Sequence, residues 1–253
     1  MCALSVVIIT HNEEKNIQRC LESVKDIADE IIIVDSYSDD KTVAICEQYN
    51  AQITMHAFSG FGKQKQYANS LANHEMILSM DADEALSEEL RESVQNALQS
   101  GKSDVYTMNR LTNFCGKWIH HGGWYPDTKI RLFKKTKADW NDLPVHEILE
   151  VSKDARVTHL KGDLLHYSIE SMSYHVAQIN TYSSIAAAHL VSKHKIISLL
   201  HILFKPLVRF IKIYIIKLGF LDGFYGFVIA RNSAFALFLR YAKAKEIKKK
   251  KKQ

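Results

Sequence analysis

The sequence contains few residues of the kinds that build disulfide frameworks, zinc sites or flexible linkers. Its four cysteines, at positions 2, 20, 46 and 115, show no CxxC spacing and no histidine at zinc-finger distance, so we interpret them as reduced structural thiols of a cytosolic protein. Only 3 prolines and 10 glycines occur among 253 residues, and no linker or internal repeat divides the chain. These absences favour one good-sized domain with an appendage.

Several signals of other protein classes are also absent. The chain has no GxGxxG fingerprint, no Walker motif and no GxSxG elbow. It has no uncharged run of the roughly 18 residues needed to cross a bilayer. Met1 leads directly into a strand pattern, without a basic segment or a cleavage site. We therefore expect no signal peptide, and a main body that faces the cytoplasm.

Charge is unevenly distributed along the chain. The net charge is +5, but from Lys193 onward 15 Lys and Arg residues stand against two acidic residues, which gives +13. The preceding part has 18 basic and 26 acidic residues, which gives −8. A mildly acidic body thus precedes a strongly basic and apolar tail, and such a tail indicates a partner of negative charge.

Apolar runs and helical patterns alternate through the first hundred residues. Strands are predicted at 4–9, 30–35, 52–56 and 77–80, and helices at 17–24, 42–49, 63–73 and 87–98. Asn12 is a candidate N-cap for the first helix. This alternation predicts βαβ units, a mostly parallel sheet with helices on both faces, and strand ends gathered along one edge.

Polar side chains stand where three of these strands end, at Thr10, Asp35, and Asp81 with Asp83. In an extended segment, residues i and i+2 point the same way, so Asp81 and Asp83 can converge on one object. Two like charges held close cost free energy unless a cation offsets them. Oxygen ligands suit Mg²⁺ or Mn²⁺, which can itself hold phosphates. The pattern therefore predicts a metal and phosphate site in a crevice at this edge.

Further candidate residues lie outside the acidic segment. Lys63, Lys65 and Arg131 are candidate phosphate contacts, with solvated surface charge as the alternative for the two lysines. Arg131 lies inside an apolar strand, which favours a functional role for it. The loop at 115–127 is rich in Gly, Trp and His, as loops that shape substrate sites commonly are.

Six short segments together resemble the motifs of the family 2 glycosyltransferases, which have the GT-A fold. They are 5–13 (SVVIITHNE), 33–42 (IVDSYSDDKT), 81–84 (DADE), 122–127 (GGWYPD), 131–134 (RLFK) and 145–147 (VHE). The later segments resemble the branch that adds sugars to the inner core of lipopolysaccharide, with the core β-1,4-glucosyltransferase type as the nearest likeness. The resemblance implies a Rossmann-like, mixed and mostly parallel sheet at 1–192, of which 1–100 binds the nucleotide-sugar and 101–192 the acceptor.

The resemblance also implies residue roles for an inverting, metal-dependent transfer from a UDP-sugar. Asp35 would bind the uracil, with Thr10 and Asn12 lining the nucleotide pocket. Asp83 would ligate the metal ion, and Asp81 would hold the ribose or assist the ion. A cation stabilises the charge that the departing diphosphate gains in the transition state.

An inverting transfer needs one general base for the acceptor hydroxyl. By motif position Glu147 is the first candidate, Asp127 is the reserve candidate, and a structural role for Glu147 is the alternative. His166, with His146, is a candidate base-orienting residue or metal ligand, against the more common structural role of a single histidine.

The tail at 193–253 has basic residues at helical intervals among aliphatic and aromatic ones. This pattern predicts an amphipathic helix in the interface of an anionic membrane, strengthened by the polybasic end. A packed helical hairpin that folds back through Gly219, Gly223 and Gly226 is the alternative. Nucleic acid is disfavoured, because the basic residues alternate with aliphatic rather than exposed aromatic residues.

These inferences combine into one functional prediction. We expect a peripheral enzyme on the inner face of the cytoplasmic membrane that moves a sugar, glucose by resemblance, to a hydroxyl of a lipid-linked oligosaccharide such as the lipopolysaccharide inner core. Two alternatives stay open: a polyprenyl-phosphate glycosyltransferase, and a membrane-docked nucleotide-sugar binding module without catalysis. Sugar identity and linkage are not determined by these motifs, because single pocket contacts of about 1–3 kcal/mol decide them.

Overall fold

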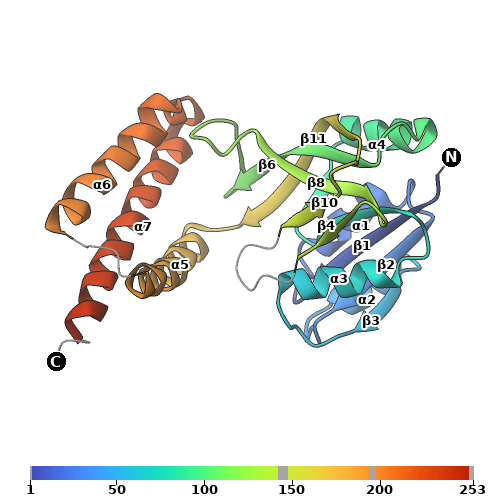
Figure 1. Cartoon of the computed structure of the whole chain (residues 1–253), viewed down its shortest axis with the longest axis horizontal. Helices are drawn as coiled ribbons and strands as arrows, with labels where there is room; N and C mark the ends of the chain where they lie inside the picture. Colours follow the sequence, from blue (N-terminus) through green and yellow to red (C-terminus); the bar gives the residue numbers. More distant parts are fainter. Residues whose placement is uncertain (1, 142–147, 194–197, 251–253) are drawn as a thin grey trace. The chain divides into compact units, whose positions relative to one another are not determined.

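The computed structural model describes residues 2–141, 148–193 and 198–250 (Figure 1). The chain forms two compact units. Unit 1 consists of Met1–Arg110 and Asp127–Tyr167, and unit 2 of Leu111–Pro126 and Ser168–Gln253. The predicted functional division at residue 192 stays a prediction.

Unit 1 is built on a mixed β-sheet whose first half is parallel. Its elements, in chain order, are β1 (Leu4–Thr10), α1 (Ile17–Val24), β2 (Glu30–Asp35), α2 (Thr42–Glu47), β3 (Gln52–Met55), α3 (Phe61–Leu71), β4 (Met76–Asp81), β5 (Glu84–Leu86), α4 (Glu88–Ser100), β6 (Val105–Phe114), β8 (Asp127–Lys134), β9 (Ala138–Trp140), β10 (Leu149–Val151) and β11 (Val157–Ile169). Strands β6 and β11 end in unit 2.

The main sheet has the strand order β3-β2-β1-β4-β8-β6-β11-β5. Strands β3, β2, β1 and β4 pair in parallel, whereas β8 pairs antiparallel to β4 and to β6. The short strands β9 and β10 form a separate two-stranded sheet. The predicted α/β class, with βαβ units in its first hundred residues, is therefore confirmed.

Side-chain alternation along β1 explains why helices cover both faces of this sheet. Val6 and Ile8 point into one buried cluster, which α1 and α4 complete, while Val7 points into a second cluster beside α3. The cap of α4 is as predicted, since the Ser87 hydroxyl accepts a hydrogen bond from the Leu90 N–H at 3.2 Å.

The parallel register brings the polar strand ends together. Thr10 is paired with Asp35 across β1 and β2, and Ile9 with Asp81 across β1 and β4. Three strand ends that are 25 to 71 residues apart in sequence thus lie at one edge of unit 1, as their spacing predicts.

Unit 2 contains the short strand β7 (Lys117–Ile119) and three long helices, α5 (Met172–Ser192), α6 (Leu199–Ile211) and α7 (Gly223–Lys250). A π-helical turn, η1 (Lys212–Ile216), and a 3₁₀ turn, η2 (Gly219–Asp222), join α6 to α7. Helix α7 packs against both α5 and α6 (Figure 1). The tail therefore forms a helical hairpin, which was one of the two predicted alternatives.

The hairpin turn closes where two glycines meet. A Cβ atom on Gly226 would lie 1.8 Å from the carbonyl oxygen of Gly219, so the two backbones touch. Among the described residues, no helix is long and apolar enough to span a membrane.

Candidate functional site

The end of β2 carries a buried carboxylate that is held in a fixed orientation. Asp35 accepts hydrogen bonds at Oδ2 from the Thr10 hydroxyl at 2.7 Å and from the Ser38 hydroxyl at 2.5 Å. Its Oδ1 accepts from the Ser38 N–H at 2.7 Å. Because Asp35 is fully buried and locked by the turn that follows it, this end of the strand is preorganised.

Asn12 joins the two loops at this edge instead of capping a helix. Its φ of 56° is left-handed, a conformation that asparagine tolerates. Its side-chain Oδ1 accepts from the Asp39 N–H at 3.0 Å, and its own N–H donates to the Ser38 hydroxyl at 2.8 Å. The first helix begins only at Ile17, so the predicted N-cap at Asn12 was wrong.

Asp81 has both carboxylate oxygens in ion pairs. Lys65 Nζ lies 2.8 Å from Oδ1, and Arg131 Nη2 lies 2.6 Å from Oδ2. Burial alone would raise the pKa of this carboxyl, but the charges of Arg131 and Lys65 outweigh it and hold the pKa well below its ordinary value. Asp81 is therefore ionised throughout the neutral range.

Glu84 is a buried member of the same cluster that sequence reasoning missed. Its two oxygens accept from Arg131 at 3.0 Å (Nε) and 2.7 Å (Nη2), and Oε2 also accepts from the Asp81 N–H at 3.1 Å. The available signal was an acid opening a short apolar strand directly after Asp83. Glu84 thus stabilises the positions of the Asp81 backbone and the Arg131 side chain.

Trp140 covers the cations of this cluster. Lys65 Nζ lies 4.5 Å and Arg131 Cζ 5.6 Å from the centre of an indole ring that is almost fully buried. The indole N–H donates to the Ser79 hydroxyl at 3.3 Å. Cation–π contact and the ion pairs together offset the cost of burying two cations.

Asp83 and His166 form a separate pair beside this cluster. His166 Nε2 lies 3.2 Å from Asp83 Oδ2, and the Tyr167 N–H donates to the Asp83 carbonyl at 2.8 Å. Antiparallel pairing of β5 with β11, which sets His166 opposite Glu84, brings these residues together. Lys65 and Arg131 thus form ion pairs with Asp81, whereas Asp83 contacts His166.

Asp83 and His166 are the described residues that we consider as ligands of a metal ion at this edge. Over residues 2–141, 148–193 and 198–250, no group of three or more His, Cys, Asp and Glu side chains is arranged to hold an ion. The Asp83 carboxylate nevertheless suits Mg²⁺ or Mn²⁺, which usually bind one or two protein carboxylates plus phosphate oxygens, whereas the His166 imidazole is a ligand more typical of softer metal ions.

The remaining predicted residues are placed as follows. Asp127 accepts at Oδ2 from Arg110 Nε at 3.0 Å and Nη2 at 2.8 Å, and Lys129 Nζ lies 2.9 Å from its Oδ1. Burial opposes these contacts, yet they lower the pKa of Asp127 below its ordinary value. Lys63 is exposed on α3. Glu147 and His146 lie outside the described residues.

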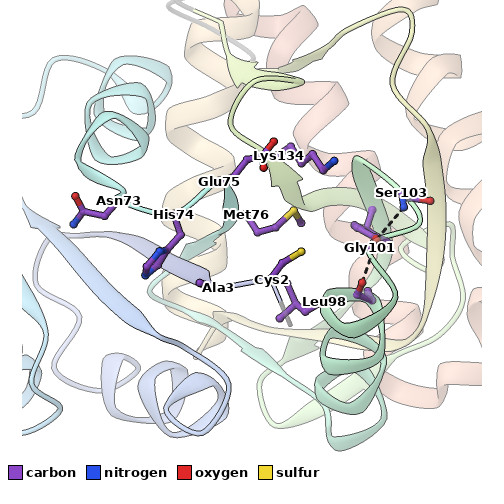
Figure 2. Close-up of a pocket in the computed structure, with 12 residues that line it drawn as sticks. Cys2, Ala3, Asn73, His74, Glu75, Met76, Leu98, Gly101, Ser103 and Lys134 are labelled. Atoms are coloured by element: carbon purple, nitrogen blue, oxygen red, sulfur yellow. Dashed lines mark hydrogen bonds between the residues drawn. The ribbon is translucent and has the colours of Figure 1, made fainter.

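Unit 1 also contains a cavity of about 320 Å³, whose lining residues are drawn in Figure 2. Its lining includes Ala3 and Met76, next to or at the starts of β1 and β4, and Leu98 and Gly101 at the end of α4. Thr10 and Asp81 stand at the opposite ends of these two strands and do not line this cavity.

Comparison with known proteins identifies consistent relatives. Residues 5–151 match the family model described as Glycosyl transferase family 2. An "Uncharacterized glycosyltransferase" of Rickettsia bellii is 34% identical over 96% of this chain and 86% of its own length. The "Lipopolysaccharide core biosynthesis glycosyltransferase LpsC" of Rhizobium meliloti is 28% identical over 95% of this chain and 91% of its own. Among solved structures, S. aureus TarS 1-349 in complex with UDP is similar with a TM-score of 0.49 and 15% identity, over 98% of this chain and 92% of that one.

Proposed function

The chain belongs to glycosyl transferase family 2, and from this premise we propose that it is an inverting enzyme that moves a sugar from a UDP-sugar to a hydroxyl of a lipid-linked oligosaccharide. The observation that carries the proposal is the meeting of Thr10, Asp35 and Asp81 at neighbouring strand ends of unit 1. The sugar is glucose by resemblance.

The two ends of the donor have distinct partners in the proposal. Asp35, fixed by Thr10 and Ser38, receives the uracil, and Asn12 holds the loops around it. Asp81 receives the ribose, because its ionised oxygens are hydrogen-bond acceptors of fixed orientation. Arg131 and Lys65 hold Asp81 in place, and Lys63 on α3 supplies further positive charge toward the diphosphate.

A divalent cation belongs to the same proposal, with Asp83 and His166 as its protein ligands. When bound, it stabilises the charge that develops on the departing diphosphate.

Glu147 is the proposed general base, in preference to Asp127. Both oxygens of Asp127 are engaged by Arg110 and Lys129, and its pKa is lowered, so it is a weak proton acceptor. Its contacts suit a structural role at the start of β8. The assignment of Glu147 rests on its position in the VHE segment.

The proposed acceptor is the inner core of lipopolysaccharide or a similar glycolipid. Supporting observations are the similarity to the R. meliloti protein named for core biosynthesis and the basic, apolar helices of unit 2. An acceptor anchored in lipid explains a peripheral position on the inner face of the cytoplasmic membrane.

A donor screen tests the proposal. The protein would be incubated with deep-core-truncated lipopolysaccharide, Mg²⁺ or Mn²⁺, and single UDP-sugars, and the mass added to the glycolipid would be read by mass spectrometry. A single hexose added from UDP-glucose is the expected result. Transfer to polyprenyl phosphate but not to the truncated core would replace the acceptor, and donor binding without any transfer would reduce the protein to a binding module.

A further inference from the structure

The solvent-facing side of α6 is apolar along its whole length. Its members are large aliphatic or aromatic side chains, each 42% or more exposed: Leu199, Leu200, Leu203, Phe204, Leu207, Val208 and Ile211. Adjacent pairs recur every four residues, which places all seven side chains on one broad stripe of the helix. We call this stripe the α6 face.

The turn between α6 and α7 extends the apolar surface. Ile216 is 70% exposed and Phe224 69% exposed, and Leu218, Phe220 and Leu221 are exposed beside them. A groove of about 600 Å³ between α6 and α7 shares Leu203 and Leu207 with the α6 face. Isolated apolar side chains on a surface are normal, but a contiguous patch of this kind marks an interaction site.

The positive charges around this surface favour a partner that is negatively charged. Residues 198–250 contain 11 Lys and Arg residues and two acidic residues. One acid, Asp222, is buried, and the other, Glu246, pairs with Lys250 at 2.7 Å. The exposed cations of α6 and the turn, Lys205, Arg209, Lys212 and Lys217, therefore have no acidic side chain within 198–250 left to neutralise them. Apolar side chains flanked by cations fit the interface of an anionic bilayer.

The hairpin turn is also fastened to the loop that the sequence predicts to shape the acceptor site. The buried Asp222 carboxylate accepts from the N–H groups of His120 at 3.3 Å and His121 at 2.8 Å, and lies 3.0 Å from His121 Nδ1. The Gly122 N–H donates to the Lys217 carbonyl at 2.8 Å.

The backbone on the loop side of this contact favours glycine, because Gly123 has a φ of +78°. The Lys217 side chain packs directly against Gly123, so a Cβ atom there would make the lysine move. The loop and the turn consequently form one body within unit 2, so whatever fixes the turn in space also fixes the loop.

We infer that the α6 face and the turn dock on an anionic bilayer surface, and that Asp222 holds the loop at 115–126 at that surface, where a glycolipid presents its sugars. The docking part stands without the proposed function, while the part about the acceptor rests on it. A second copy of this chain is a poorer occupant, because two such faces would bring like charge against like charge.

Vesicle co-sedimentation tests the docking. Wild type should bind vesicles of phosphatidylglycerol and phosphatidylcholine in equal parts, and bind less as salt rises. The double variant Phe204→Glu/Val208→Glu should bind at least about tenfold more weakly, since each change removes an exposed apolar side chain that docking would bury in the bilayer interface. The matched control is Ile185→Glu on α5, 53% exposed and outside the α6 face, which should bind as wild type does.

Equal binding of wild type and the double variant would overturn the docking, as would equal binding to pure phosphatidylcholine. So would a wild-type dimer in light scattering that the double variant converts to a monomer, because the face would then be a contact between copies.

The variant Asp222→Ala tests the link to the acceptor loop. It should bind vesicles as wild type does and keep the KM for the UDP-sugar, while the KM for vesicle-embedded truncated lipopolysaccharide rises about tenfold or more. Asp222→Asn, which keeps one acceptor oxygen for the loop, should recover part of that loss.

An unchanged acceptor KM in Asp222→Ala would overturn the link. So would an equal rise in the donor and acceptor KM values, because that pattern indicates general misfolding. A wild-type protein that binds vesicles but transfers nothing would instead count against the proposed function and leave the docking supported.

Discussion

The charged cluster at the strand ends of unit 1 and the α6 face of unit 2 differ in how their charged and apolar side chains are satisfied. In the cluster formed by Lys65, Asp81, Glu84, Arg131 and Trp140, the two carboxylates are paired with the two cations, and the Trp140 ring packs over those cations. On the α6 face, apolar side chains face solvent, and the cations beside them lack acidic partners within 198–250.

The cluster of unit 1 is complete without a ligand, whereas the α6 face is not. Buried charges are tolerated only when they are paired and hydrogen-bonded, so the cluster must be fully assembled before any ligand arrives. A large exposed apolar patch costs free energy until something covers it, so the α6 face is completed by a partner. In our proposals, the cluster of unit 1 belongs to the site of sugar transfer, and the α6 face binds the membrane.

The largest expected effect is a loss of sugar transfer without a loss of UDP binding. Glu147→Gln should lower the transfer rate by about 10²–10⁴-fold, the usual contribution of a general base. Binding of UDP, measured by titration calorimetry, should be unchanged. Asp127→Asn is the control, and its rate should fall far less because Asp127 is already ion-paired. A larger loss in Asp127→Asn than in Glu147→Gln would reverse the assignment.

The next effect tests whether the cluster depends on its pairing. Arg131→Met should lower the free energy of unfolding by about 3–5 kcal/mol, because it leaves the buried carboxylate of Glu84 and the partly exposed carboxylate of Asp81 without their shared cation. Lys129→Met, on the same strand but in a partly exposed pair with Asp127, should cost at most about 1 kcal/mol. Urea denaturation measures both. Equal losses in the two variants would show that burial adds nothing to the pair.

A smaller effect tests the hairpin turn. Gly226→Ala should destabilise the protein by about 1–3 kcal/mol, even though alanine is the better helix former, because its Cβ would overlap the Gly219 carbonyl oxygen. Thermal unfolding measures it. Ser233→Ala on the same helix should stay within about 0.5 kcal/mol of wild type. A gain in stability for Gly226→Ala would contradict the close approach of the two backbones.

The smallest effect concerns pH. The pKa of Asp81 is lowered in the folded state from its ordinary value of 3.8, so its ion pairs contribute stability above that value and lose it as pH falls through the lower folded pKa. The difference in unfolding free energy between wild type and Asp81→Asn should therefore be constant above about pH 5 and shrink below about pH 4. A difference that changes between pH 6 and 8 would contradict the assigned direction.

The strand-end part of the site was predictable from sequence because it is local. Each apolar run ends on its own polar residue, and parallel pairing then brings Thr10, Asp35 and Asp81 together without further information. Asn12 was misread because a left-handed residue that links two loops has the same sequence signature as a helix cap.

The supporting contacts were not predictable, because they depend on long-range register. Arg131 reaches Glu84, 47 residues away, only because β8 pairs antiparallel to β4. The hydrogen bond from the His121 N–H to Asp222 joins residues 101 positions apart and depends on how the hairpin packs in unit 2. The periodicity of a sequence predicts which face of a strand or helix a residue occupies, but not which distant residue it contacts there.

The measurement closest to the central claim is a calorimetric titration of the full chain with UDP, with and without Mg²⁺ or Mn²⁺. Wild type should bind UDP only when a divalent ion is present. Asp35→Ala should weaken UDP binding at least about tenfold, which is the scale of losing a charged hydrogen-bond partner. Asp83→Asn should lose most of the UDP affinity that the divalent ion provides. Wild-type protein that binds no UDP with either ion, or variants that bind it as tightly as wild type, would contradict the gathering of a nucleoside diphosphate at these strand ends.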